Sequence, residues 1–133
     1  MAVSDQISDF LTRVRNASKA QHRYVDVEWS RLKESMANIL KEQGFIENVV
    51  VKKDSPSRGT VRMFLKYTPA RQSVIKGLKR YSKPGLRRYV GSEEIPHFFG
   101  GLGLSILSTS EGLLAGSECK RRKIGGELLC MVW

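Results

Sequence analysis

Cysteine is scarce in this sequence of 133 residues. Its two cysteines, Cys119 and Cys130, have no CxxC or Cys/His spacing around them that would suggest a zinc site. We therefore interpret both as reduced structural thiols and predict neither a metal nor a cofactor.

Long apolar runs are also missing. A membrane-spanning helix needs about 20 consecutive apolar residues, and the sequence contains no such run. Charged residues from Asp5 to Lys19 interrupt the first part of the chain, which excludes the apolar core of a secretory signal. We expect a cytosolic protein without a membrane partner.

Catalytic signatures are absent as well. Neither His22 nor His97 accompanies a GxSxG serine elbow, and the glycines of residues 100–103 match no complete phosphate-binding motif. The carboxylates of Glu93 and Glu94 would point apart on a strand, which does not suit paired acid/base chemistry. The sequence indicates a non-enzymatic protein, and a hydrolase with an unrecognised serine nucleophile is the weakest alternative.

Negative charge is outweighed by positive charge. The chain has 23 Lys and Arg against 13 Asp and Glu, a net charge of +10 and a pI near 10.0. Such an excess favours a polyanionic partner, because neutralising phosphates releases their condensed counterions. The alternatives are a merely basic solvated surface and a general DNA- or RNA-binding nucleoid-type protein, which the charge alone would permit.

Two amphipathic helices are predicted in the first part of the chain. Apolar residues recur every three or four positions over residues 7–17, and a second such stripe follows Ser30, a typical N-cap. Gly44 ends the second helix, where a left-handed residue is common. Between the helices, residues 24–29 have the composition of a short strand.

Two β-rich runs follow, at residues 45–52 and 60–67, and flank a loop of turn-forming residues at 54–59. They complete an α-β-α-β-β module, which we end at Pro69. The predicted class is α+β. Its two small modules are an N-terminal α-β-α-β-β module over 1–68 and a C-terminal, mostly antiparallel β module with short helices over 69–133.

The second module opens with a run of cations that contains no acidic residue. A turn at residues 82–85 would display them on a hairpin-like edge. Tyr81 and Tyr89 lie inside the run and could stack on RNA, although burial in the core is the preferred interpretation for both. The cations are Arg71, Lys76, Lys79, Arg80, Lys83, Arg87 and Arg88.

A loop rich in hydroxyl groups, residues 108–112, follows a predicted buried strand at 102–107. Short hydroxyl side chains on an ordered turn approach a sugar or a base edge more closely than a long cation does. Such loops are more often plain turns. A polar stretch ending in residues 120–123 and a last strand at 127–133 complete the chain.

Several separated segments resemble the ribosomal protein S8 family of the bacterial small subunit. They are residues 11–17 (LTRVRNA), 40–46 (LKEQGFI), 82–87 (SKPGLR), 101–103 (GLG) leading to 108–112 (STSEG), and 125–130 (GGELLC). Their common order along essentially the whole chain makes the resemblance more specific than any one motif.

The resemblance implies a protein that binds a helical junction in the central domain of 16S rRNA early in small-subunit assembly. It implies neighbouring small-subunit proteins as partners, a monomer within the ribosome, and in some bacteria translational autorepression through the operon's own mRNA. The carried-over RNA-binding residues are Ser108, Thr109, Ser110, Gly112, Glu127, Arg87 and Tyr89, with Thr12, Arg13, Arg15 and Asn16 as a second contact. Lys79 and Lys83 are added as phosphate anchors from the cationic run.

Two positions depart from the family pattern. Glu111 occupies a loop position where a cation is common, which should weaken the local attraction for phosphate. The cations Arg121, Arg122 and Lys123 make the stretch before Gly125 more basic than expected and would offset that loss.

Overall fold

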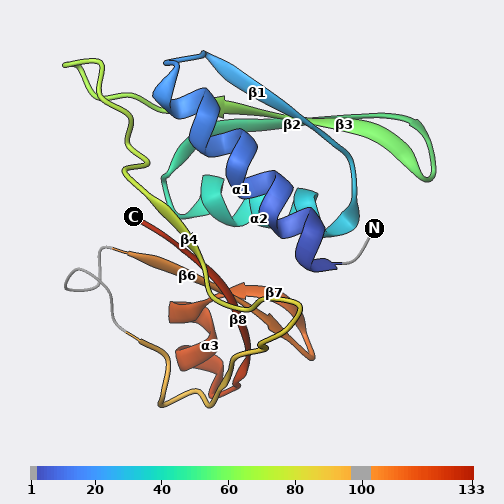
Figure 1. Cartoon of the computed structure of the whole chain (residues 1–133), viewed down its shortest axis with the longest axis vertical. Coiled ribbons are helices and arrows are strands. Elements are labelled where there is room, and N and C mark those ends of the chain that lie inside the picture. Colours follow the sequence, from blue (N-terminus) through green and yellow to red (C-terminus); the bar gives the residue numbers. More distant parts are fainter. Residues whose placement is uncertain (1–2, 97–102) are drawn as a thin grey trace. The chain divides into compact units, whose positions relative to one another are not determined.

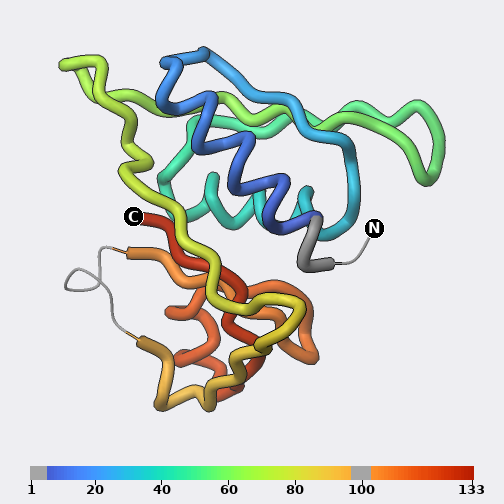
Figure 2. The backbone as a smooth tube through the Cα atoms, in the orientation of Figure 1, coloured from blue at the N-terminus to red at the C-terminus, as the bar shows by residue number. Residues whose placement is uncertain are grey.

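The computed structural model describes residues 3–96 and 103–133, with side chains from residue 6 onward, so His97, Gly100 and Gly101 lie outside the described residues. The chain divides into two compact units, Met1–Lys76 (unit 1) and Gly77–Trp133 (unit 2). Figures 1 and 2 show the elements and the path of the backbone within each unit. None of the helices in the described ranges is long and apolar enough to cross a membrane.

Unit 1 has the predicted α-β-α-β-β order. Its elements are α1 (Val3–Lys19), β1 (Tyr24–Glu28), α2 (Arg31–Glu42), β2 (Ile46–Ser55) and β3 (Arg58–Leu65). The strands form an antiparallel sheet in the order β1-β3-β2. On β3, Val61, Met63 and Leu65 are buried while Arg62 and Phe64 between them are half-buried, so one face of the sheet packs in the core with the helices.

The boundaries of α2 follow from its local sequence. Ser30 has an extended backbone and its hydroxyl accepts a hydrogen bond from the Lys33 N–H at 3.1 Å, as predicted for an N-cap. The helix ends at the C-cap Gln43, and Gly44 follows with a φ of +82°. Met36, Ala37, Ile39 and Leu40 form its buried stripe.

The hairpin of β2 and β3 is longer than predicted, because the expected loop at residues 54–59 is mostly strand. Only Pro56 and Ser57 separate the two strands, and an irregularity in register between Lys53 and Ser55 accommodates Asp54. The prediction of a loop was wrong here, because a β-bulge at Asp54 allows the two strands to remain paired through these turn-forming residues. Figure 1 shows the tip of this hairpin extending past both helices.

Unit 1 also continues beyond Pro69, where the sequence suggested the boundary. The Thr68 N–H donates to the Gln72 carbonyl at 2.8 Å, and the Val74 N–H donates to the Lys66 carbonyl at 2.9 Å. The amide of Gln21 donates to the carbonyl of Arg71 at 2.8 Å. The segment after Pro69 thus folds back on unit 1, and the division of the chain falls after Lys76.

Unit 2 is mostly antiparallel β. Its elements are β4 (Leu78–Arg80), β5 (Tyr89–Val90), β6 (Leu104–Thr109), β7 (Gly112–Ala115), α3 (Gly116–Arg122) and β8 (Gly126–Val132). The sheet runs β4-β8-β6-β7, and β5 also pairs with β8. Ile95, Leu107, Cys119 and Leu128 form a buried cluster, which confirms the α+β class with a second, β-rich core.

Two sequence-based expectations in unit 2 need correction. The cations do not lie on one hairpin, because β4 and β5 both pair with β8 and not with each other. Residues 116–122 form a helix where only a polar stretch was expected. The sequence of α3 has no repeating apolar pattern that would predict a helix, because after Gly116 only Cys119 is buried in it.

Candidate nucleic-acid interface

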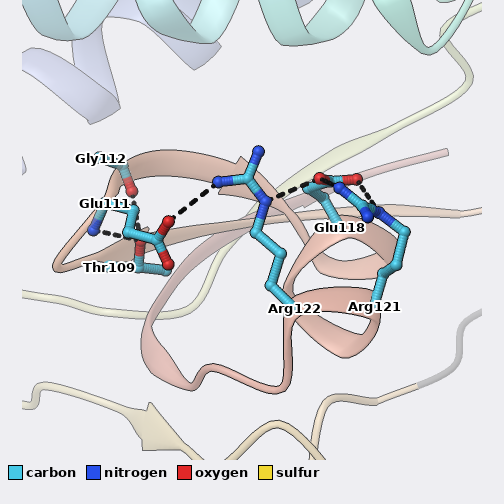
Figure 3. A network of polar contacts seen from close by, with 6 residues as sticks. All are labelled: Thr109, Glu111, Gly112, Glu118, Arg121 and Arg122. Carbon is cyan, nitrogen blue, oxygen red and sulfur yellow. Dashed lines mark hydrogen bonds and ion pairs between the residues drawn. The ribbon is translucent and has the colours of Figure 1, made fainter.

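The hydroxyl loop is the tight turn of the β6–β7 hairpin (Figure 3). The Thr109 hydroxyl donates to the Gly112 carbonyl at 2.8 Å and accepts from the Glu111 N–H at 3.0 Å. Gly112 has a φ of +98°, a conformation that favours glycine. Thr109 therefore uses its hydroxyl to shape the turn, while Ser110 at the tip is exposed.

A network of ion pairs ties this turn to α3. Arg122 Nη1 lies 3.2 Å from Glu111 Oε1, and Arg122 Nε lies 2.7 Å from Glu118 Oε1. Arg121 also pairs with Glu118 through both of that residue's carboxylate oxygens. Figure 3 shows the guanidinium of Arg122 between the two carboxylates. Glu111 is thus paired with a cation and not an isolated negative charge in the loop.

The same network lowers the pKa of the Glu118 carboxyl to about 2, first through hydrogen bonds from Arg121 and Arg122 and then through their positive charge. Two of the cations that were expected to offset Glu111 are therefore engaged within unit 2. Sequence reasoning missed this role, although the spacing of Glu118 from Arg121 and Arg122 is the helical i+3 and i+4 pairing that could have revealed it.

Three strands bring distant residues into one row beside the loop. Glu127 on β8 lies opposite Ser108 on β6 and opposite Tyr89 on β5. Residues directly opposite in a sheet point to the same face. Ser108, Glu127 and Tyr89 therefore share a face, and Tyr89 is 71% exposed.

Arg87 joins this row through an ion pair. Its Nη1 lies 3.1 Å from Glu127 Oε2, and the Glu127 side chain is only 13% exposed. The pair engages Glu127, and the Arg87 side chain remains 42% exposed. The strand register and this ion pair thus bring Arg87 and Tyr89 together with Glu127 and Ser108, which are distant from them in sequence.

Two glycines allow the strands to approach each other at this point. A Cβ on Gly125 would lie 2.3 Å from the Val90 carbonyl oxygen, and a Cβ on Gly126 would lie 2.3 Å from that of Ser108. Neither distance is compatible with a side chain. The glycine pair at the start of β8 is therefore a requirement for assembling the row.

Hydrogen bonds of residues 82–88 order the segment that carries the other cations. Buried Ser82 accepts a hydrogen bond from the Arg88 N–H at 3.0 Å. Lys83 and Leu86 exchange two backbone hydrogen bonds of 2.9 and 3.0 Å across the predicted turn. Lys83 is exposed at this turn, and Lys79 is exposed on β4.

The two tyrosines of this segment have different surroundings. Tyr81 packs against the buried cluster of unit 2, and the charged groups of Lys79 and Arg88 lie 5.3 and 5.7 Å from its ring centroid. Tyr89 is exposed. The core interpretation is correct for Tyr81 and wrong for Tyr89.

The second predicted contact lies on α1 in unit 1. Thr12, Arg13 and Asn16 are exposed, and Arg15 is half-buried. Arg13 Nε lies 3.2 Å from Asp9 Oδ1, and Asp9 Oδ2 lies 3.4 Å from Nζ of the buried Lys33. The second predicted contact is therefore made of side chains that all belong to unit 1.

The exposed groups of these surfaces include hydroxyls, cations and the Tyr89 ring. Among residues 3–96 and 103–133 there is no group of three or more His, Cys, Asp and Glu residues that could hold a metal ion. Both cysteines are free and buried, and burial raises the pKa of the Cys130 thiol to about 12. The polar tip, the exposed tyrosine and the cations suit recognition of a polyanion.

Comparison with known proteins gives consistent matches along the chain. The model of the family described as ribosomal protein S8 matches residues 5–133. Proteins named small ribosomal subunit protein uS8 are 64% identical over 133 residues in Protochlamydia amoebophila, with all of both chains covered, and 49% identical over 133 residues in Pediococcus pentosaceus, again with all of both covered. The homologue of that name in Chlamydia felis is 52% identical over 130 residues, 98% of this chain and 97% of its own. The chain belongs to the ribosomal protein S8 family, whose members are structural and not enzymatic.

Proposed function

We propose that this protein is a cytoplasmic constituent of the small ribosomal subunit that binds a helical junction in the central domain of 16S rRNA and supports assembly of the subunit. In this proposal the protein acts as a monomer within the ribosome, beside other small-subunit proteins. Unit 2 supplies the main contact through the β6–β7 turn and the row of Ser108, Glu127 and Tyr89. The exposed residues of α1 supply the second.

The observation that carries the proposal is the convergence of an ordered polar tip and an exposed aromatic ring on one surface. Thr109 and the Glu111–Arg122 pair fix the tip, so Ser110 is presented without a large loss of conformational entropy on binding. Tyr89 offers a face for a base or a ribose. Exposed Lys79 and Lys83 supply attraction for phosphates that does not depend on sequence.

Ser110→Ala tests the role of the tip. Loss of one hydrogen bond should weaken binding to the junction RNA about fivefold to tenfold, or ~1–1.5 kcal/mol, while binding to unrelated duplex RNA stays nearly unchanged. Filter binding at fixed salt measures both affinities. The matched control is Ser57→Ala, which removes an exposed serine from the turn of the β2–β3 hairpin and should change neither affinity.

If Ser110→Ala weakened binding to the junction RNA and to the duplex RNA equally, the β6–β7 turn would have no role in recognising the junction. Duplex DNA belongs in the same assay, because equal affinity for DNA and for the junction would favour a nucleoid-type protein. A messenger RNA that folds into the same junction would meet the same surface. Repression of the protein's own operon is therefore part of the proposal, and the operon's leader RNA is its probe.

A further inference from the structure

Glu111 places a carboxylate in the β6–β7 turn, directly after the exposed Ser110. The Glu111 side chain is 50% exposed. Charge alone would make this residue unfavourable for RNA binding, because a carboxylate repels phosphates and binding depends on excess positive charge. The contacts of Glu111 point to the opposite effect.

Glu111 is held through both its backbone and its side chain. Its N–H donates to the Thr109 hydroxyl at 3.0 Å, and its Oε1 accepts a hydrogen bond from Arg122 Nη1 at 3.2 Å. Because Ser110 lies between Thr109 and Glu111, these two contacts restrict the positions that the Ser110 hydroxyl can take.

Arg122 is a suitable anchor because α3 holds it in turn. Arg122 Nε donates to Glu118 Oε1 at 2.7 Å, one helical turn earlier. Cys119, which follows Glu118, is buried in the core cluster of unit 2 together with Leu107 of β6. Contacts thus lead from the core through α3 and Arg122 to the turn, as Figure 3 shows for the polar part.

We propose that Glu111 and Arg122 are positioning residues for RNA recognition, so that an acidic residue in the turn strengthens binding to the junction. The pair holds the turn in the conformation that presents Ser110, and Arg122 neutralises a carboxylate that would otherwise repel phosphate. Neither side chain needs to contact the RNA. This inference rests on the proposed RNA contact of the β6–β7 turn and adds to it the residues that position Ser110.

A double-mutant cycle tests this role, because charge and positioning predict opposite signs. Glu111→Ala removes a negative charge, yet it should weaken binding to the junction RNA. Since exposed ion pairs are weak, we expect a loss of about twofold to fourfold, with no loss on unrelated duplex RNA. In the Arg122→Ala background the carboxylate lacks its arginine partner, and Glu111→Ala should there strengthen junction binding or leave it unchanged.

Glu47→Ala is the matched control. Glu47 is exposed on β2 of unit 1, so its removal makes the same change in net charge without touching the turn, and it should not weaken junction binding. Filter binding at fixed salt gives the affinities, and thermal unfolding shows that each variant is folded.

The inference is overturned if Glu111→Ala fails to weaken junction binding in the parent chain, or weakens it equally in the Arg122→Ala chain. A parent chain that binds the junction RNA no better than the duplex RNA would instead reject the proposed function, and this inference with it.

Discussion

The β2–β3 and β6–β7 hairpins have the same connection and different tips. Each joins neighbouring antiparallel strands through two residues, Pro56 and Ser57 in one and Ser110 and Glu111 in the other. The β2–β3 tip carries an irregularity in register, whereas the β6–β7 tip is closed by a threonine hydroxyl and tied to α3. The two tips therefore differ in their side-chain contacts and not in the length of their loops.

The largest effect is expected where a glycine allows strands to meet. A Cβ at Gly126 would lie 2.3 Å from the Ser108 carbonyl oxygen, and one at Gly59 would lie 2.5 Å from that of Lys52. Gly126→Ala should lower the free energy of unfolding by about 2–3 kcal/mol, because β8 is held between other strands. Gly59→Ala should cost about 1 kcal/mol, because the end of a hairpin can open. Urea unfolding measures the free energy of unfolding of both variants. Equal losses in the two variants would contradict the expected difference between the two hairpins.

A smaller effect is expected from the threonine hydroxyl. Thr109→Val removes both hydrogen bonds of the turn and should cost about 1 kcal/mol, whereas Thr109→Ser keeps them and should cost less. Hydrogen exchange of the Glu111 N–H should accelerate in the valine variant alone. Unchanged exchange in that variant would mean that the hydroxyl does not hold the turn.

The smallest effect is expected from the ion pairs, and it depends on pH. The pKa of Glu118 is lowered in the folded chain to about 2, so its contribution to stability is present above its ordinary pKa of 4.5 and is lost as the pH falls toward 2. Glu118→Gln should therefore lower the Tm at pH 7, and the difference from the parent should disappear near pH 2. A difference that persists at low pH would assign the effect to packing instead of charge.

Much of unit 1 was predictable because its signals are local. The spacing of apolar residues over 7–17, the N-cap Ser30 and the left-handed Gly44 give the helices and their ends. The hairpin was predicted too short, because turn-forming residues do not reveal whether a bulge lets the strands continue. The end of the unit was missed since it depends on long-range contacts, such as that of Gln21 with Arg71.

Unit 2 was less predictable because its candidate site is assembled from segments that are distant in sequence. The sequence identified the hydroxyl loop, and the family resemblance added Arg87, Tyr89 and Glu127. It could not show that Glu127 lies between Ser108 and Tyr89, since that depends on strand register. Nor could it show that Thr109 acts within the turn and that Glu111 is paired with Arg122. These roles follow only from geometry.

Strand β8 pairs with β4, β5 and β6, all of which precede it in the chain. During synthesis, unit 1 is therefore complete while the sheet of unit 2 still lacks its central strand. The β6–β7 turn is held by Thr109 and by the ion pair with α3, but within the described residues β5 and β6 are joined only through β8. The row of Ser108, Glu127 and Tyr89 is consequently assembled only when β8 pairs with β5 and β6.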